Sequence, residues 1–131
     1  MNRPLLCSAL LAAFVACVHI FLGGPTIATP LLNSGLEPET KLTLYACWHI
    51  VSVTLTLSAI ALMRAALPRH TTKMHDAVIL VSLLWCGFGV VFFVIAAIQG
   101  DVEWFLRLPQ WMLITPVGAL GLWGARRSTR A

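Results

Sequence analysis

Two histidines lie inside long apolar stretches of the chain, where ionisable side chains are rare. His19 stands near the end of the first stretch and His49 near the start of the second. A neutral imidazole binds haem iron and transition metals readily, and it also carries protons near neutral pH. Ionisable side chains within membrane spans commonly mark functional sites. The first candidates for chemistry in this sequence are therefore His19 and His49.

Polar residues accompany His49 at helical spacing. Tyr45, His49, Ser52 and Thr56 stand at i, i+4, i+7 and i+11, so they share one face of a helix, while Leu, Ile, Val and Ala occupy most of the other positions. In a bilayer, such a polar stripe is expected to face other helices or a wet cavity. The spacing thus predicts a polar interior formed by these side chains.

Three interpretations of the histidines stay open on the sequence alone. The first is a pair of buried side chains that hydrogen-bond to neighbouring helices, as is common in membrane proteins. The second is a cofactor or metal site in which His19 and His49 hold haem or a transition metal between facing helices. The third is a proton or substrate pathway through the same residues. Further partners or ligands would come from Glu37, Tyr45, Cys47, Ser52, Asp101 and Glu103.

The composition of the whole chain indicates an integral membrane protein. Of its 131 residues, 59% are hydrophobic and 11% are charged, whereas soluble domains carry about 25% charged residues. The mean hydropathy is +0.86. One compact domain is expected in the lipid bilayer, and no basic patch interleaved with exposed aromatic residues predicts nucleic-acid binding.

Four apolar segments predict an all-α fold, a four-helix transmembrane bundle with up-down-up-down order. Gly23-Gly24-Pro25 is expected to end the first segment, Pro68 the second and Gly100 the third, while Pro109 suits the first turn of the fourth. A cleaved signal peptide is the alternative for the first segment, although no good cleavage site follows it. The expected spans cover about residues 5–22, 42–67, 77–98 and 109–123.

The basic residues predict the orientation of the bundle. Seven would lie on one side and only Lys41 and Arg107 on the other, so the positive-inside rule places both termini in the cytoplasm. The acidic residues show the opposite bias, with Asp76 alone on the cytoplasmic side. Topology therefore explains the net charge of +4. The seven basic residues are Arg3, Arg64, Arg69, Lys73, Arg126, Arg127 and Arg130.

No pattern in the sequence predicts an enzyme. A Ser-His-Asp order, a phosphate loop and a dinucleotide-binding fingerprint are all missing, so no catalytic residue is assigned. The four cysteines lie in apolar stretches without a C-x-x-C pair, as is typical of small buried hydrophobic side chains. A Cys17–Cys47 disulfide near the outer face is an alternative that spacing does not decide.

Three short motifs resemble a group of small bacterial four-helix inner-membrane proteins. They are residues 18–24 (VHIFLGG), the Trp48-His49 pair and residues 108–111 (LPQW). That group carries a histidine late in the first span and Trp-His early in the second. Many members have Gly-Glu where this chain has Gly23-Gly24, so one candidate ligand or proton carrier is missing here. The resemblance implies four spans and a place in the bacterial inner membrane.

The small size and scarce polar content favour an accessory or structural membrane component. It would work as a homo-oligomer or within a larger membrane complex, and a dimer would use the glycine-bearing faces around Gly87 and Gly118. A haem- or metal-binding protein and a small transporter or proton pathway are the alternatives.

Overall fold

All regular secondary structure is helical in the residues that the computed structural model of the protein describes, which are 2–68, 70 and 73–128. Three helices are long and apolar enough to cross a membrane: Arg3–Leu22, Pro38–Ala66 and His75–Ile98. The predicted all-α class is therefore confirmed, together with three segments of the kind that a membrane protein needs.

The first helix is longer than predicted. α1 (Arg3–Cys17) passes into two π-helical segments, η1 (Val18–Leu22) and η2 (Gly24–Ala28), and then into α2 (Thr29–Leu32). The predicted end at Gly23-Gly24-Pro25 was wrong. Pro25 has no N–H to donate, and the wider turns of a π-helix accommodate this gap in the hydrogen-bond ladder. The Thr26 hydroxyl also donates to the Leu22 carbonyl at 2.8 Å. The helix changes its winding at the proline instead of stopping there.

The second and third long helices begin and end close to the expected residues. α3 (Pro38–Ala66) starts with proline in its first turn, where a missing N–H costs little, and ends just before Pro68. α4 (His75–Ile98) ends before Gly100, which has φ of 76°. Glycine adopts this left-handed conformation without strain. Because the first helix continues to Leu32, the expected long loop 23–41 is reduced to residues 33–37.

The last long helix differs in character from the other three. α5 (Glu103–Arg107) precedes α6 (Gln110–Ser128), which contains Pro116. α6 is not among the three helices that are apolar enough to span a membrane by composition. Its glycines, its proline and the two arginines near its end account for this low hydropathy. The membrane crossing predicted for residues 109–123 therefore stays a prediction.

Two glycines of α6 lie against α4, where a larger side chain would overlap its residues. A Cβ atom on Gly118 would meet Cys86 and the backbone of Ser82 in α4, and one on Gly121 would meet the Ser82 side chain. Small residues of this kind allow helix backbones to approach closely. The face around Gly118 is therefore occupied by α4, whereas a Cβ on Gly87 would meet no atom within 4 Å.

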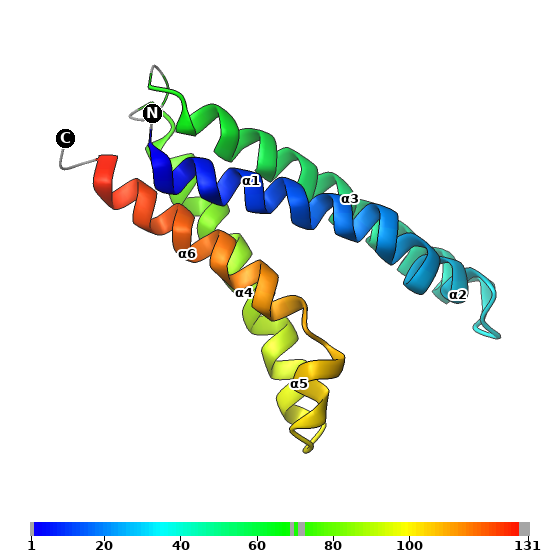
Figure 1. Ribbon diagram of the computed structural model, residues 1–131. Coiled ribbons are helices and arrows are strands. Elements are labelled where there is room, and N and C mark those ends of the chain that lie inside the picture. Colours follow the sequence, from blue (N-terminus) through cyan, green and yellow to red (C-terminus); the bar gives the residue numbers. More distant parts are fainter. Residues whose placement is uncertain (1, 69, 71–72, 129–131) are drawn as a thin grey trace.

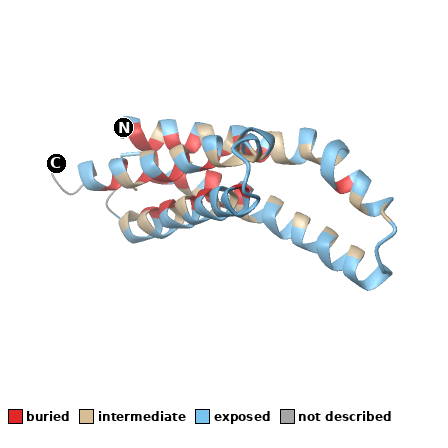
Figure 2. Ribbon diagram, turned by 90° about the horizontal axis from the view of Figure 1, so that it is seen from below, coloured by how far each residue is buried: buried red, intermediate tan, exposed pale blue. Residues whose placement is uncertain are grey.

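The helices form two arms that are joined at one end (Figure 1). α1 packs on α3 in one arm and α4 packs on α6 in the other, and the arms meet mainly where α1 packs on α6. The start of α1 and the end of α6 lie at this joined end, and the arms diverge toward α2 and α5, which we call the open end. Figure 2 shows that most buried residues lie in the joined half. The described helices thus form a V that is packed at one end.

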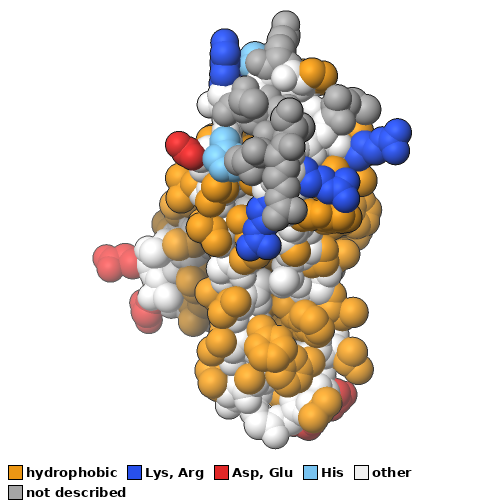
Figure 3. Space-filling model, turned by 90° about the vertical axis from the view of Figure 1, so that its left-hand side faces the viewer, with side chains coloured by type: hydrophobic (Ala, Val, Ile, Leu, Met, Phe, Trp, Pro, Cys, Tyr) orange, Lys and Arg blue, Asp and Glu red, His pale blue; other side chains and the backbone are white. Residues whose placement is uncertain are grey.

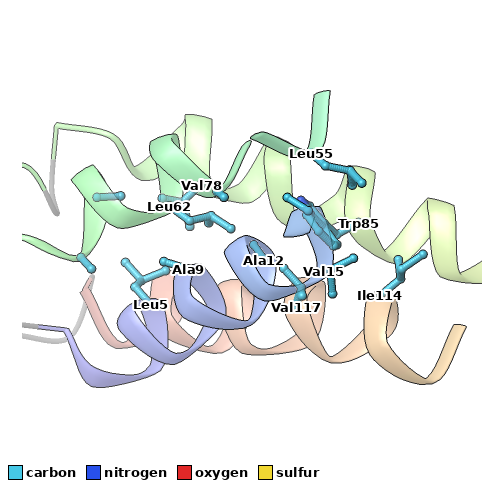
Figure 4. Close-up of a cluster of buried hydrophobic side chains, with 14 of the residues drawn as sticks. Leu5, Ala9, Ala12, Val15, Leu55, Leu62, Val78, Trp85, Ile114 and Val117 are labelled. Carbon is cyan, nitrogen blue, oxygen red and sulfur yellow. The ribbon is translucent and has the colours of Figure 1, made fainter. Parts of the chain in front are cut away.

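A continuous apolar core fills the joined end (Figure 4). Trp85 is fully buried there, and its Nε1 donates a hydrogen bond to Ser58 Oγ at 3.0 Å. The buried Ser8 hydroxyl donates to the Val117 carbonyl at 2.7 Å. Buried polar groups are nearly always paired in this way. The apolar members around them include Leu5, Ala9, Ala12, Val15, Leu55, Leu62, Val78, Ile114 and Val117.

Asn2 makes hydrogen bonds to three helices at the joined end. Its Oδ1 accepts from the Leu5 N–H in the first turn of α1 at 3.3 Å, which is a helix cap. Its Nδ2 donates to the Gly124 carbonyl of α6 at 2.9 Å, and its own N–H donates to the Ala66 carbonyl of α3 at 3.2 Å. Asn2 therefore links helices of both arms at the end where the arms are joined.

Charged residues are distributed unequally between the two ends. Figure 3 views the joined end, where lysine and arginine side chains gather. Glu37 and Glu39 lie instead at the start of α3. Asp101 lies between α4 and α5, and Glu103 begins α5, so all four are toward the open end. The predicted Arg69 and Arg130 lie outside the described residues. By their places in the helices, the described basic residues of the joined end are Arg3, Arg64, Lys73, Arg126 and Arg127.

Candidate functional site around His19

His19 lies between the first helix and α3, beyond the buried core. Its half-buried imidazole stacks on the indole ring of Trp48, with ring centroids 3.8 Å apart and ring planes inclined by 20°. Its Nε2 lies 3.1 Å from Ser52 Oγ and 3.3 Å from the Trp48 carbonyl oxygen. The three residues form one cluster across the helix interface.

The contacts of this cluster favour one nitrogen of His19 as the carrier of the hydrogen. The Ser52 hydroxyl donates to the Trp48 carbonyl at 3.1 Å, so its single hydrogen is already used. The same carbonyl oxygen accepts only, and it lies near His19 Nε2. All three contacts are favourable when Nε2 carries the hydrogen and donates. In the neutral ring, Nδ1 then keeps the free lone pair.

Gly23 and the π-helical segments make room for Trp48. His19 is the second residue of η1, and Gly23 follows it by four residues. A Cβ atom on Gly23 would overlap the six-membered ring of Trp48. His19 therefore stacks on the indole, and Gly23 leaves room for it because glycine has no side chain. π-Helical turns inside α-helices frequently accompany functional sites.

His49 has a different environment from His19. It is exposed, and its ring meets the Tyr45 ring edge-on, with centroids 4.6 Å apart and an interplanar angle of 88°. No hydrogen bond joins either ring to another residue in the described part of the chain. Trp48 points toward the first helix, and the next residue of an α-helix is turned by about 100°. His49 is therefore turned away from the face of α3 on which Trp48 meets His19, and the two imidazoles neither stack nor share a hydrogen bond in the described part of the chain.

The stripe of polar residues on α3 is distributed between the helix interface and the surface. Ser52 reaches the neighbouring helix through His19, and Tyr45 is half-buried. Thr56 is exposed, and its hydroxyl donates to the Ser52 carbonyl of its own helix at 2.8 Å. The face of α3 that contacts the first helix is formed by Trp48 as well as by Ser52. Sequence reasoning gave Trp48 no packing role, and it expected Gly23 to help end the first helix instead of making room for an indole.

Further metal ligands do not gather around His19. Within residues 2–68, 70 and 73–128, no group of three His, Cys, Asp or Glu side chains is placed to hold a metal ion. Asp101 Oδ1 accepts from the Glu103 N–H at 2.9 Å, and Glu103 pairs with Arg107 at 3.0 Å, in the other arm. Glu37 and Cys47 are exposed.

The four cysteines are free thiols, and the Cys17–Cys47 disulfide is not formed. Cys7, Cys17 and Cys47 are exposed and Cys86 is half-buried, so three of them were wrongly expected to be buried. In a helix that faces lipid, a cysteine packs against acyl chains as a small hydrophobic side chain, without a protein neighbour.

The function is therefore inferred from this geometry, since no protein-family model matches the chain and neither a curated protein nor a solved structure matches it.

Proposed function

We propose that the protein is an accessory or structural component of a bacterial inner membrane, which assembles through the open end of its V with other membrane-embedded helices. The observation that carries this proposal is the divergence of the two arms, which leaves large apolar side chains of the open half without a neighbour in the chain (Figures 1 and 2). Examples are Phe21, Leu22, Leu44, Ile98 and Leu106, whose exposed fractions run from 45% to 73%.

The lengths of the helices support a tilted insertion. α3 has 29 residues and is roughly 43 Å long, whereas the hydrocarbon layer of a bilayer is about 30 Å thick. A helix that exceeds the membrane thickness tilts, kinks or projects from the surface. Two arms that diverge from a shared end cannot both stand perpendicular to the membrane, so at least one of them tilts. The basic residues of the joined end support a cytoplasmic location for that end and for both termini.

The Tyr45–His49 pair favours a protein partner over lipid alone. His49 lies fifteen residues before Arg64 on α3, so it is roughly 22 Å from the basic end and still within the hydrocarbon layer. Its imidazole is exposed and has no hydrogen-bond partner among the described residues. An unpaired polar group in hydrocarbon is costly. A neighbouring helix that offers a donor or an acceptor at this depth would remove that cost.

Site-specific photocrosslinking in the native membrane tests this assembly. A photoreactive amino acid at position 49 is expected to yield one dominant crosslinked product, either with a second copy or with another membrane protein. The matched control is position 80, where Leu80 is 70% exposed but lies in the joined half of α4. Crosslinks to lipid alone at both positions would contradict the proposal.

The protonation of His19 favours cofactor or metal binding as a second candidate function. Histidines that bind metals usually donate their other ring N–H to a carbonyl or carboxylate, as His19 Nε2 does with the Trp48 carbonyl. Nδ1 would then be the ligating atom. Purified protein incubated with haem or Zn²⁺ tests this: a spectral or calorimetric signal that disappears in His19→Ala but persists in His75→Ala supports it, and the absence of a signal contradicts it.

A further inference from the structure

A shallow apolar crevice lies between α3 and α4 at the joined end. Its walls come from the last turns of α3, the residue before α4 and the first turns of α4, and every lining side chain is apolar. It is open to the surroundings along one side. The two helices touch little elsewhere, so the crevice continues the weak contact between the arms. The lining residues are Ala61, Leu62, Met74, Ala77, Val78 and Val81.

Groups that suit an anion adjoin this crevice. Lys73 is exposed and directly precedes Met74 of the lining, and Arg64 is exposed and follows Ala61 by three residues. α4 begins at His75, and its first turn has no side-chain cap. The free N–H groups and the positive end of the helix dipole at such a terminus attract phosphate oxygens.

A buried polar atom without a partner belongs to the first residue of α4, beside the lining residue Met74 in the sequence. His75 Nδ1 is buried and makes no hydrogen bond to any residue that the structure describes. Buried polar atoms of this kind are rare and costly, and a bound ligand is one common reason for them. Asp76 is the one acidic residue nearby; it is exposed, and its position on α4 is turned roughly 150° from the middle of the crevice-lining positions. Asp76 is thus turned away from the apolar walls, but it lies in the first turn of α4 and offsets part of the positive dipole that attracts an anion.

We propose that this crevice binds an anionic glycerophospholipid of the cytoplasmic leaflet. One acyl chain lies along the apolar walls, and the phosphate lies at the start of α4, beside Lys73 and within reach of Arg64. An apolar slot that ends in basic side chains and free N–H groups matches the two parts of such a lipid. The proposal depends on the membrane embedding of the joined end, and it is independent of the partner proposed for the open end.

Native mass spectrometry of the full-length protein in detergent tests the proposal. Phosphatidylglycerol is added in one series and phosphatidylcholine with the same acyl chains in another. We expect retained phosphatidylglycerol and little phosphatidylcholine. Lys73→Gln should weaken phosphatidylglycerol binding by about fivefold, the effect of one basic residue on an anionic lipid. Lys41→Gln removes the same charge at the open end and should leave binding unchanged.

The apolar half of the site has its own pair of variants. Ala77→Leu fills the crevice and should lower phosphatidylglycerol retention, whereas Ala97→Leu places the same side chain at an exposed position in the open half of α4 and should not. Circular dichroism confirms that both variants fold. Equal binding of the two lipids, or equal effects of Lys73→Gln and Lys41→Gln, would overturn the proposal. Displacement of the lipid by soluble glycerol phosphate would also overturn it, because the site would then recognise phosphate alone.

Discussion

The His19 imidazole stacks on the Trp48 indole with ring centroids 3.8 Å apart, and its Nε2 lies 3.3 Å from the carbonyl oxygen of the same residue. The ring is therefore held both by its face and by its edge. This double contact ties the first helix to α3 beyond the apolar core. It also explains why a histidine is compatible with this depth in a membrane: its N–H is paired within the protein, and one ring face is covered.

The fit of Trp48 against Gly23 predicts an unequal effect of two neighbouring substitutions. Gly23→Ala should destabilise the protein by about 1–3 kcal/mol, because the new Cβ overlaps an indole that is already fixed by the His19 stack. Gly24→Ala meets no atom within 4 Å and should be neutral or stabilising by up to about 1 kcal/mol, as expected for glycine in a helix. Denaturant unfolding in detergent, followed by tryptophan fluorescence, measures both; equal effects would argue against the packing described.

The hydrogen bond to Ser52 predicts a modest but specific loss. Ser52→Ala should cost about 0.6 kcal/mol, a typical value for an interhelical hydrogen bond in a membrane protein. Thr56→Ala, one turn further along α3, removes only a bond within its own helix and should cost less. Comparison of the two unfolding free energies is the test. A larger loss for Thr56→Ala would contradict the assignment of the interface.

The protonation state of His19 is measurable on its own. Nitrogen-15 chemical shifts of histidine-labelled protein should show a hydrogen on Nε2 and a lone pair on Nδ1 for this residue. His19→Ala identifies the signal. A neutral ring with its hydrogen on Nδ1 would be inconsistent with the hydrogen bond to the Trp48 carbonyl, which can only accept, and it would remove the support for cofactor or metal binding.

Trp85 should be the most sensitive single position of the core. It is fully buried and donates to Ser58, so Trp85→Phe loses volume and also a hydrogen bond, at a cost of about 1–3 kcal/mol. Trp123→Phe is the control, because Trp123 is 51% exposed. A double-mutant cycle with Ser58→Ala should give a coupling of about 0.5 kcal/mol or more. No coupling would show that the indole N–H is satisfied elsewhere.

The close approach of α6 to α4 predicts a contrast between two glycines. Gly121→Ala should destabilise by about 1–3 kcal/mol, because its Cβ would overlap the Ser82 side chain, which already donates to the Val78 carbonyl. Gly87→Ala faces open space and should not destabilise. The unfolding midpoints of the two variants report this directly. A stable Gly121→Ala protein would mean that α4 and α6 are further apart than described.

Hydrophobic patterning predicted the helical class. Pro68 and Gly100 predicted where α3 and α4 end, because both residues act through local backbone chemistry. The same rules failed at Gly23-Gly24-Pro25. A proline ends a regular α-helix, but a π-helical turn absorbs it, and nothing local in the sequence distinguishes the two outcomes.

Only part of the site around His19 was predicted, because local sequence patterns do not reveal how distant side chains pack. Apolar periodicity singled out His19, and its interhelical hydrogen bond to Ser52 is one of the interactions expected for it. The rotation of α3 depends on where the Trp48 indole packs, and that depends on the missing side chain of Gly23 in another helix. Such long-range fits are set by tertiary packing, so the exposed position of His49 did not follow from its polarity.

The divergence of the two arms is the feature on which the proposed assembly depends, and a distance measurement in a lipid nanodisc tests it. Spin labels at Ser34 and Asp101, in a variant whose four cysteines are replaced by alanine, report the separation of the two arm tips (Figure 1). Labels at Arg3 and Arg126 report the joined end. We predict that the tip pair is much further apart than the pair at the joined end. Neighbouring helices in a closed bundle have axes only about 8–10 Å apart, and a tip separation as short as that at the joined end would contradict the open V.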